Sequence, residues 1–411
     1  MTVIYEKRPQ TGIITTNIVY KVGSRDENMG ETGLAHMLEH MLFKPTSHDL
    51  KQKLPSHAMR FESETGCILN ANTWKDRTTY YFSYPKEYFK RALTIEYERM
   101  RDLEITDIEF KPEQGNVLSE YDMYNGDPQY ALASNMVATA FYSHPYGHET
   151  LGWREDIEDY TSEKLNQFYK KHYRPDNATL MVVGDIELDE ALKEVREIFT
   201  NIKAETTAIQ RRSIREPIQE GERRIVITRP LENRVLAIGG KHAGFPTREW
   251  YATELLLDVL TEDDKGILYE LLVDRGLAAD VSSMVEPTKE DNLAIIFVTL
   301  TNKADPAKVE RMIIETILEL NIDEIAIRLP SLIAQRVTAE IMARESSLGV
   351  IRDLTEYVSA DALKTHDKVE KTLKSINVLD VQNIAREVFK PNNRTIGMAL
   401  RKERSIKLNT F

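Results

Sequence analysis

The chain has 411 residues, of which 41% are hydrophobic and 29% are charged, and its formal net charge is -12 at pH 7. One core of ordinary size does not accommodate this length, and the composition is typical of globular rather than disordered or fibrous proteins, so two domains are expected. The acidity argues against a nucleic-acid surface, and no apolar run approaches the roughly 20 residues that span a membrane.

The N-terminal sequence and the cysteine content bear on the cellular compartment. The sequence MTVIYEKRPQTG has neither the apolar stretch of a secretion signal nor the Arg- and Ser-rich character of a transit peptide, which predicts a cytoplasmic protein. Cys67 is the single cysteine, so an internal disulfide is impossible and thiol catalysis is not expected.

Three segments in the first half have the pattern of β-strands. Residues 14–22 repeat with the period of two that a strand requires. Residues 78–84 and 178–183 are further strand-like runs, and helical patterns separate the three segments. This alternation predicts an α+β domain.

A surface linker is expected near the middle of the chain. Residues 205–224 are charged, contain Pro217 and Gly221, and lose the apolar periodicity of their neighbours. We therefore predict an N-terminal domain at 1–204 and a C-terminal domain at 225–411.

The second half repeats the pattern of the first. Residues 235–240 correspond to residues 18–23, and residues 389–395 echo residues 173–179 at nearly the same offset. Two matches at one offset predict an internal duplication, with two homologous α/β domains.

The strongest chemical signal is the sequence His-Met-Leu-Glu-His at residues 36–40. On a helix, positions four apart share a face, so His36 and His40 can reach one metal ion. A catalytic zinc needs three protein ligands and a position for water, and a nearby carboxylate must accept the proton of that water. Glu39 can supply this carboxylate.

A second helix is expected to provide the third ligand. We predict that it starts at Pro112, because proline suits the first helical position. Glu113 and Glu120 are seven residues apart and so share one face of this helix. From the residues alone, either could be the ligand.

These residues resemble the inverted zinc peptidases, the family that includes pitrilysin, insulysin and the mitochondrial processing peptidase. The resemblance covers nearly the whole chain. The stretches that carry it are, in order, 36–46 (HMLEHMLFKPT), Asn70-Ala71-Asn72-Thr73, Thr79-Tyr80-Tyr81, Glu113 with Glu120, His144-Pro145-Tyr146-Gly147, Gly152, Tyr173-Arg174-Pro175-Asp176-Asn177 and Val183-Gly184-Asp185.

The resemblance implies a role for each residue of the motif. His36, His40 and Glu120 would bind one zinc ion per chain, and Glu39 would activate the water on that zinc. Glu113 would serve catalysis as a carboxylate that orients a ligand. The two domains would be arranged like a clam around a closed chamber.

The resemblance also implies where the substrate binds. The family's equivalent of Asn70, Ala71, Asn72 and Thr73 is an exposed edge strand that pairs with the extended backbone of the substrate. Pairing through the main chain implies weak sequence specificity.

The second half departs from the family pattern. It has no His-x-x-Glu-His, and Leu272 and Ala279 stand where family members often carry an Arg and a Tyr that bind substrate carbonyls. We therefore expect a related chain without metal to supply the pair in a heterodimer. The alternative is a homodimer in which Arg275, or Arg352 with Tyr357, takes over this role.

The sequence thus favours a zinc metalloendopeptidase that cleaves unfolded peptides or short extensions. The alternative is a non-catalytic structural or assembly subunit on the same fold, since fold alone does not decide function. Zinc storage or sensing fits less well, because such sites are usually closed by a fourth protein ligand.

Overall fold

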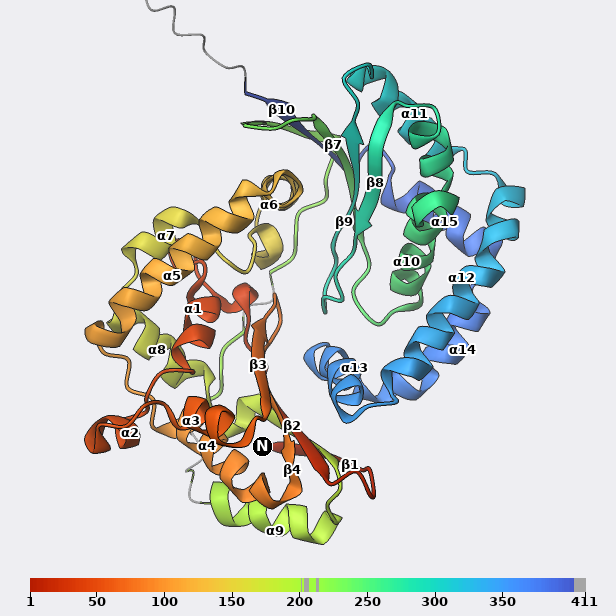
Figure 1. Cartoon of the computed structure of the whole chain (residues 1–411). Coiled ribbons are helices and arrows are strands. Elements are labelled where there is room, and N and C mark those ends of the chain that lie inside the picture. The colour runs from red at the N-terminus through yellow and green to blue at the C-terminus, as the bar shows by residue number, and fades with distance from the viewer. Residues whose placement is uncertain (201, 203–206, 212–213, 403–411) are drawn as a thin grey trace, which may run out of the picture. The chain divides into compact units, whose positions relative to one another are not determined.

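The computed structural model describes residues 1–200, 202, 207–211 and 214–402, so the expected linker positions 205, 206, 212 and 213 lie outside the described residues. The chain forms two compact units (Figure 1). Unit 1 comprises Met1–Tyr121, His148–Ile214 and Ala339–His366, and unit 2 comprises Asp122–Gly147, Arg215–Thr338 and Asp367–Phe411. These units differ from contiguous halves, because each one includes a segment from the other half of the sequence.

Unit 1 is built on a five-stranded mixed sheet in the order β1-β5-β2-β4-β3. Its strands are β1 (Thr2–Lys7), β2 (Ile13–Tyr20), β3 (Ile68–Thr73), β4 (Thr78–Pro85) and β5 (Ala178–Gly184). β1 runs parallel to β5, and the other neighbours run antiparallel. The runs predicted at 14–22, 78–84 and 178–183 are β2, β4 and β5.

Helices from the first half of the sequence cover one face of this sheet with a continuous apolar core. They are α1 (Leu34–Met41), α2 (Ser47–Gln52), α3 (His57–Thr65), α4 (Phe89–Arg101), most of α5 (Asp107–Gly126), α7 (Arg154–Asp159), α8 (Ser162–His172) and α9 (Leu188–Phe199). Met37 and Leu38 of α1 belong to the core that Ile18 and Tyr80 form on this face. The sheet therefore supports α1 directly.

The predicted start of the second helix at Pro112 is wrong. α5 begins at Asp107, and Pro112 lies inside it. Proline removes the hydrogen bond to the carbonyl four residues earlier. That carbonyl belongs to Ile108, which is 82% exposed, so water can solvate the neighbourhood of the unused acceptor.

Unit 2 repeats the sheet of unit 1, which confirms the predicted duplication. Its order is β6-β10-β7-β9-β8, with β6 parallel to β10 and the other neighbours antiparallel. The strands are β6 (Arg223–Arg229), β7 (Val235–His242), β8 (Ala278–Met284), β9 (Asn292–Leu300) and β10 (Arg394–Arg401). Each strand thus has a counterpart at the same place in the other sheet.

The helices that the second half of the sequence contributes to unit 2 also follow the plan of unit 1. They are α10 (Arg248–Thr261), α11 (Pro306–Leu318), most of α12 (Ile322–Ala343), α14 (Val369–Ser375) and α15 (Val378–Val388). α10 follows β7 as α1 follows β2, and Thr247 caps its first turn through a side-chain hydrogen bond. In the part of the chain that the structure describes, no helix has both the length and the apolar character that crossing a membrane demands.

One helix of each half packs on the sheet that the other half supplies. α6 (Pro128–Ala140) places Leu132 and Met136 in the core against β7, β9 and β10 of unit 2. α13 (Ser347–Ser359) places Ile351 and Leu354 against Val19 of β2 and its neighbours in unit 1. Val19 lies on the face of the sheet opposite to Ile18, so α13 covers the face that α1 does not.

Candidate metal centre

α1 begins at a position where only glycine fits. Gly33 precedes it with φ of 93°, and a Cβ atom there would lie 2.5 Å from the carbonyl oxygen of Leu151. A Cβ atom on Gly152 would lie 2.3 Å from the carbonyl oxygen of Thr32. Because any side chain would collide with the facing backbone, the two glycines fix the start of α1 against the loop before α7.

A buried carboxylate holds the first turn of α1. Glu27 accepts hydrogen bonds from the backbone N–H groups of Gly33 at 2.8 Å and Ala35 at 2.7 Å. These bonds satisfy donors that a helix start leaves free, and they place an acidic group at the positive end of the helix dipole. Burial nevertheless raises the pKa of Glu27 well above its usual value.

Three of the residues predicted from the sequence lie together. Oε2 of Glu120 is 3.7 Å from Nε2 of His36 and 3.3 Å from Nε2 of His40. One ligand atom from each of the three side chains lies within 4.8 Å of the other two. Two imidazole nitrogens and one carboxylate oxygen form a donor set that suits a catalytic zinc with a position left for water.

The far side of His40 is occupied, which orients its ring toward this cluster. Oε1 of Glu113 lies 2.8 Å from Nδ1 of His40. The other oxygen of Glu113 accepts from Asn116 at 3.1 Å and pairs with Lys44. Glu113 therefore fixes the tautomer that leaves Nε2 of His40 available to a metal.

The electrostatics of the metal-free cluster follow from these contacts. Burial, together with the nearby His40, lowers the pKa of His36 to about 4. Burial alone would lower the pKa of His40, but hydrogen bonds to Glu113 and Glu120 raise it to about 9. The hydrogen bond from His40 lowers the pKa of Glu113 to about 2, with Lys44 adding to the effect. A metal that binds His40 below pH 9 must therefore displace a proton.

The carboxylate of Glu39 is held by the strand beside it. Thr73, the last residue of β3, donates its hydroxyl hydrogen to Oε2 of Glu39 at 2.6 Å. Burial raises the pKa of Glu39 to about 7, and the bond from Thr73 opposes this rise. The sequence placed Thr73 in a substrate strand and gave no sign of this contact, because the two residues are far apart in the chain.

The predicted substrate strand is an edge of the sheet. β3 ends the strand order, and β4 is its one neighbour among the described strands. The side chain of Asn70 accepts from the backbone N–H of Ala71 at 2.8 Å, while Asn72 accepts from Arg77. The outer backbone edge of β3 is therefore the part of the strand suited to pairing with a peptide.

The counterpart of this site in unit 2 has different residues. Pro330 lies inside α12 as Pro112 lies inside α5. Glu254 and Asp258 of α10 follow His36 and His40 at the same sequence distance at which Pro330 follows Pro112. They are therefore the counterparts of the two histidines of α1. Arg336 of α12 binds both carboxylates, at 2.8 Å from each oxygen of Asp258 and 3.1 Å from Glu254.

A guanidinium thus takes the place in unit 2 that a metal could take in unit 1. Across residues 1–200, 202, 207–211 and 214–402, the group formed by His36, His40 and Glu120 is the one set of three such side chains placed to hold a metal. One zinc ion per chain stays a prediction, and this cluster is its candidate site.

Arg352 and Tyr357, two residues considered for binding substrate carbonyls, do not join the cluster in unit 1. Arg352 donates to the hydroxyl of Tyr81 at 3.3 Å, and Tyr357 is buried on the same helix, α13. That helix covers the sheet face opposite to α1, so these two side chains do not reach the metal cluster of their own chain. Leu272 is fully buried in a π-helical turn (Tyr269–Val273), and Ala279 lies on β8.

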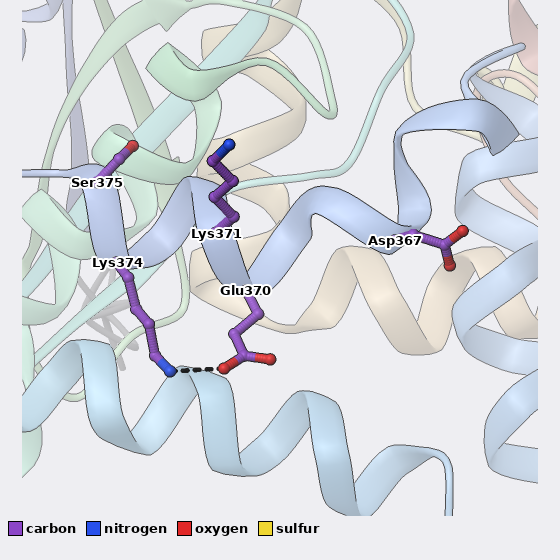
Figure 2. Close-up of a pocket in the computed structure, with 5 residues that line it drawn as sticks. All are labelled: Asp367, Glu370, Lys371, Lys374 and Ser375. Atoms are coloured by element: carbon purple, nitrogen blue, oxygen red, sulfur yellow. Dashed lines mark hydrogen bonds and ion pairs between the residues drawn. The ribbon is translucent and has the colours of Figure 1, made fainter.

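A cavity of 480 Å³ lies elsewhere, beside α14 of unit 2 (Figure 2). Its lining consists of Asp367, Glu370, Lys371, Lys374 and Ser375. Glu370 and Lys374 form an ion pair at 2.5 Å along the helix, and both side chains are more than half exposed. Such a solvated pair offers no catalytic chemistry, so the cluster on α1 and α5 is the candidate site.

Comparisons with known families cover both halves of the chain. Residues 2–153 match the family model described as "Insulinase (Peptidase family M16)". Residues 159–325 match the model described as "Peptidase M16 inactive domain". The second description is consistent with the replacement of both histidine positions in α10.

Individual relatives extend the match. A zinc protease named PqqE from Helicobacter pylori is 28% identical over 392 residues, which are 94% of this chain and 87% of that protein. A probable mitochondrial-processing peptidase subunit beta from Schizosaccharomyces pombe is 30% identical over 203 residues, which are 49% of this chain and 44% of that protein. The crystal structure of a protease from Helicobacter pylori has the same fold, with a TM-score of 0.88 at 24% identity and 96% of both chains covered.

Proposed function

This chain belongs to peptidase family M16, and we propose that it is a zinc-dependent endopeptidase that cleaves unfolded peptides or short extensions. The observation that carries the proposal is the convergence of His36, His40 and Glu120, with the carboxylate of Glu39 beside them. Relatives named zinc proteases support peptidase chemistry in general. The particular site and substrate class are our inference.

The side chains divide the chemistry among them. His36, His40 and Glu120 would hold the zinc, and Glu113 keeps Nε2 of His40 directed toward it. Bound zinc supplies a Lewis acid that lowers the pKa of water and polarises a carbonyl. Glu39 accepts the proton of the attacking water and passes it to the leaving amine.

The environment of Glu39 suits both halves of this proton transfer. A carboxyl group whose pKa is about 7 can accept a proton and return it near neutral pH. Its bond from Thr73 leaves one carboxylate oxygen, Oε1, for the water. Thr73 therefore orients the base as well as ending the strand.

The substrate would bind as an added strand. The outer edge of β3 presents backbone donors and acceptors next to the residue that holds Glu39. An extended peptide paired with this edge would be directed past the metal cluster. Because its main chain makes the pairing, its side chains would contribute little to specificity. This supports a preference for unfolded peptides over folded domains.

We further propose a partner chain that supplies an Arg/Tyr pair for the substrate carbonyl. Leu272 and Ala279 cannot donate such side-chain hydrogen bonds. A missing donor of this kind typically costs a factor of about 100 or more in rate. The match to a protein named as a subunit of a processing peptidase is consistent with a heterodimer, and a homodimer is the alternative.

Glu39→Gln tests the function directly. The amide keeps the shape of the side chain but cannot accept the proton, so zinc content should stay at one per chain while peptide hydrolysis is lost. Hydrolysis of unfolded peptides would be measured with the chain alone and with a relative that carries the Arg/Tyr pair. Wild-type protein that holds zinc but cleaves no peptide in either condition would favour a non-catalytic subunit instead.

A further inference from the structure

A buried arginine binds the end of strand β3. Arg77 lies in the turn after β3, and its side chain is almost fully buried. One nitrogen of its guanidinium donates to the side-chain oxygen of Asn72 on β3, and two others bind the carboxylate of Glu356 on α13. We call this set of Arg77, Asn72 and Glu356 the Arg77 clamp.

The clamp joins the edge strand to a helix that comes from the other half of the sequence. The side chain of Asn72 points to the sheet face covered by α13, whereas Thr73 points to the face of Glu39, as neighbours on a strand must. Arg77 thus binds Asn72 on one face of the sheet, and Glu39 binds Thr73 on the other face. The planar guanidinium suits this task, because it can bind a carboxylate with two nitrogens and an amide with the third.

An edge strand needs such a restraint because it has a neighbour on one side only. The hydrogen bonds to β4 are the whole of its backbone pairing among the described strands. A second buried contact of α13 with the same sheet face offers a comparison: Asn17 of β2 donates to the hydroxyl of Thr355 at 2.8 Å. That contact reaches a central strand and leaves β3 untouched.

We propose that Arg77 and Glu356 are positioning residues that keep the end of β3 ordered for peptide binding. The proposal rests on the proposed peptidase function and adds a role for α13 in it. Without the clamp, a fraction of the molecules would have a disordered edge that no peptide can join. A bound peptide would order β3 again by pairing with it. Because part of the binding free energy would be used for this ordering, the apparent affinity of the peptide would be lower.

This account predicts a particular split between kinetic constants. Glu356→Gln removes the charge that Arg77 binds, so KM should rise about fivefold if about one fifth of the molecules remain competent. The value of kcat at saturating peptide should stay within about twofold, because the bound strand is ordered again. Thr73→Val, by contrast, should lower kcat with little change in KM, since it frees the carboxylate of Glu39.

The matched control is Thr355→Val, one position earlier on the same helix. It removes the bond to Asn17 and should change neither KM nor kcat by more than about twofold. Amide hydrogen exchange of the metal-free protein gives a second readout, independent of activity. Residues 68–73 should exchange faster in Glu356→Gln than in Thr355→Val, with the β1–β5 pairing as the internal reference for intact folding.

Equal exchange in residues 68–73 and equal KM for the two variants would overturn the proposal. If instead the wild-type zinc protein cleaves no peptide, the peptidase function fails, while the exchange comparison still tests the clamp. Arg77→Lys provides a further check, because an ammonium cannot match the planar fork of the guanidinium. It should reproduce the faster exchange of Glu356→Gln.

Discussion

The contact between Glu113 and His40 makes a quantitative prediction about zinc affinity. Glu113 lies 2.8 Å from Nδ1 of His40 and does not contact the ligand atoms on the other side of the ring. Glu113→Gln keeps an acceptor for His40 but removes the negative charge that makes its imidazole a stronger ligand. Loss of such a carboxylate typically costs 10–100-fold in metal affinity, and we expect about tenfold, or about 1.4 kcal/mol, because the amide oxygen remains.

The same substitution should change how zinc affinity depends on pH. In the wild type, the pKa of His40 is raised to about 9, so below that pH zinc must displace a proton and its affinity increases as pH rises. Removing the charge of Glu113 lowers the pKa of His40 and weakens this proton competition. The loss of affinity should therefore be larger at about pH 9.5 than at pH 7, where the weaker competition offsets part of it.

Competition with a chromophoric chelator would measure the dissociation constant at both pH values. The structure provides a matched control in Glu98, which lies 2.8 Å from Nδ1 of His57 in the same unit but away from the cluster. Glu98→Gln should leave zinc affinity unchanged. Unchanged affinity in Glu113→Gln at both pH values would refute the orienting role of Glu113.

Two further predictions concern stability. Burial raises the pKa of Glu96 to about 7, above its unfolded value, so the native state binds the extra proton between these two pKa values. Unfolding free energy should therefore decrease as pH rises toward 7, and Glu96→Gln should flatten this decrease in chemical denaturation at pH 5 and pH 8. Arg336→Met leaves Glu254 and Asp258 without their shared partner, which should cost about 1–2 kcal/mol for this partly buried network and leave zinc content at one per chain. Equal stability of Arg336→Met and wild type would contradict the idea that the arginine replaces a metal as the link between α10 and α12.

The sequence was enough to predict which side chains meet in the cluster and that the two sheets are duplicates. The spacing of His36 and His40 requires only a helix, and the position of Glu120 followed from a resemblance spread along the chain. The start of α5 was missed because Pro112 is tolerated inside the helix, where the residue whose carbonyl loses its partner, Ile108, is 82% exposed. A proline in a sequence marks a preferred helix start but does not enforce one.

Contacts between distant segments were not predictable from local pattern. Nothing in the sequence around Thr73 indicates that its hydroxyl binds Glu39, and nothing around Glu356 indicates that it reaches Arg77. Both contacts depend on which helix packs on which sheet. The amphipathic pattern of α13 shows that this helix has a buried face, but it does not say which of two similar sheets will cover that face.

The central claim is that His36, His40 and Glu120 bind one zinc ion, and anomalous X-ray diffraction tests it most directly. Crystals of the zinc-loaded protein would be measured on both sides of the zinc absorption edge. The account predicts one edge-dependent peak per chain, about 2.0–2.2 Å from Nε2 of His36, Nε2 of His40 and a carboxylate oxygen of Glu120. A crystal with stoichiometric zinc whose peak lies elsewhere, or in which Glu113 rather than Glu120 contacts the ion, would contradict it.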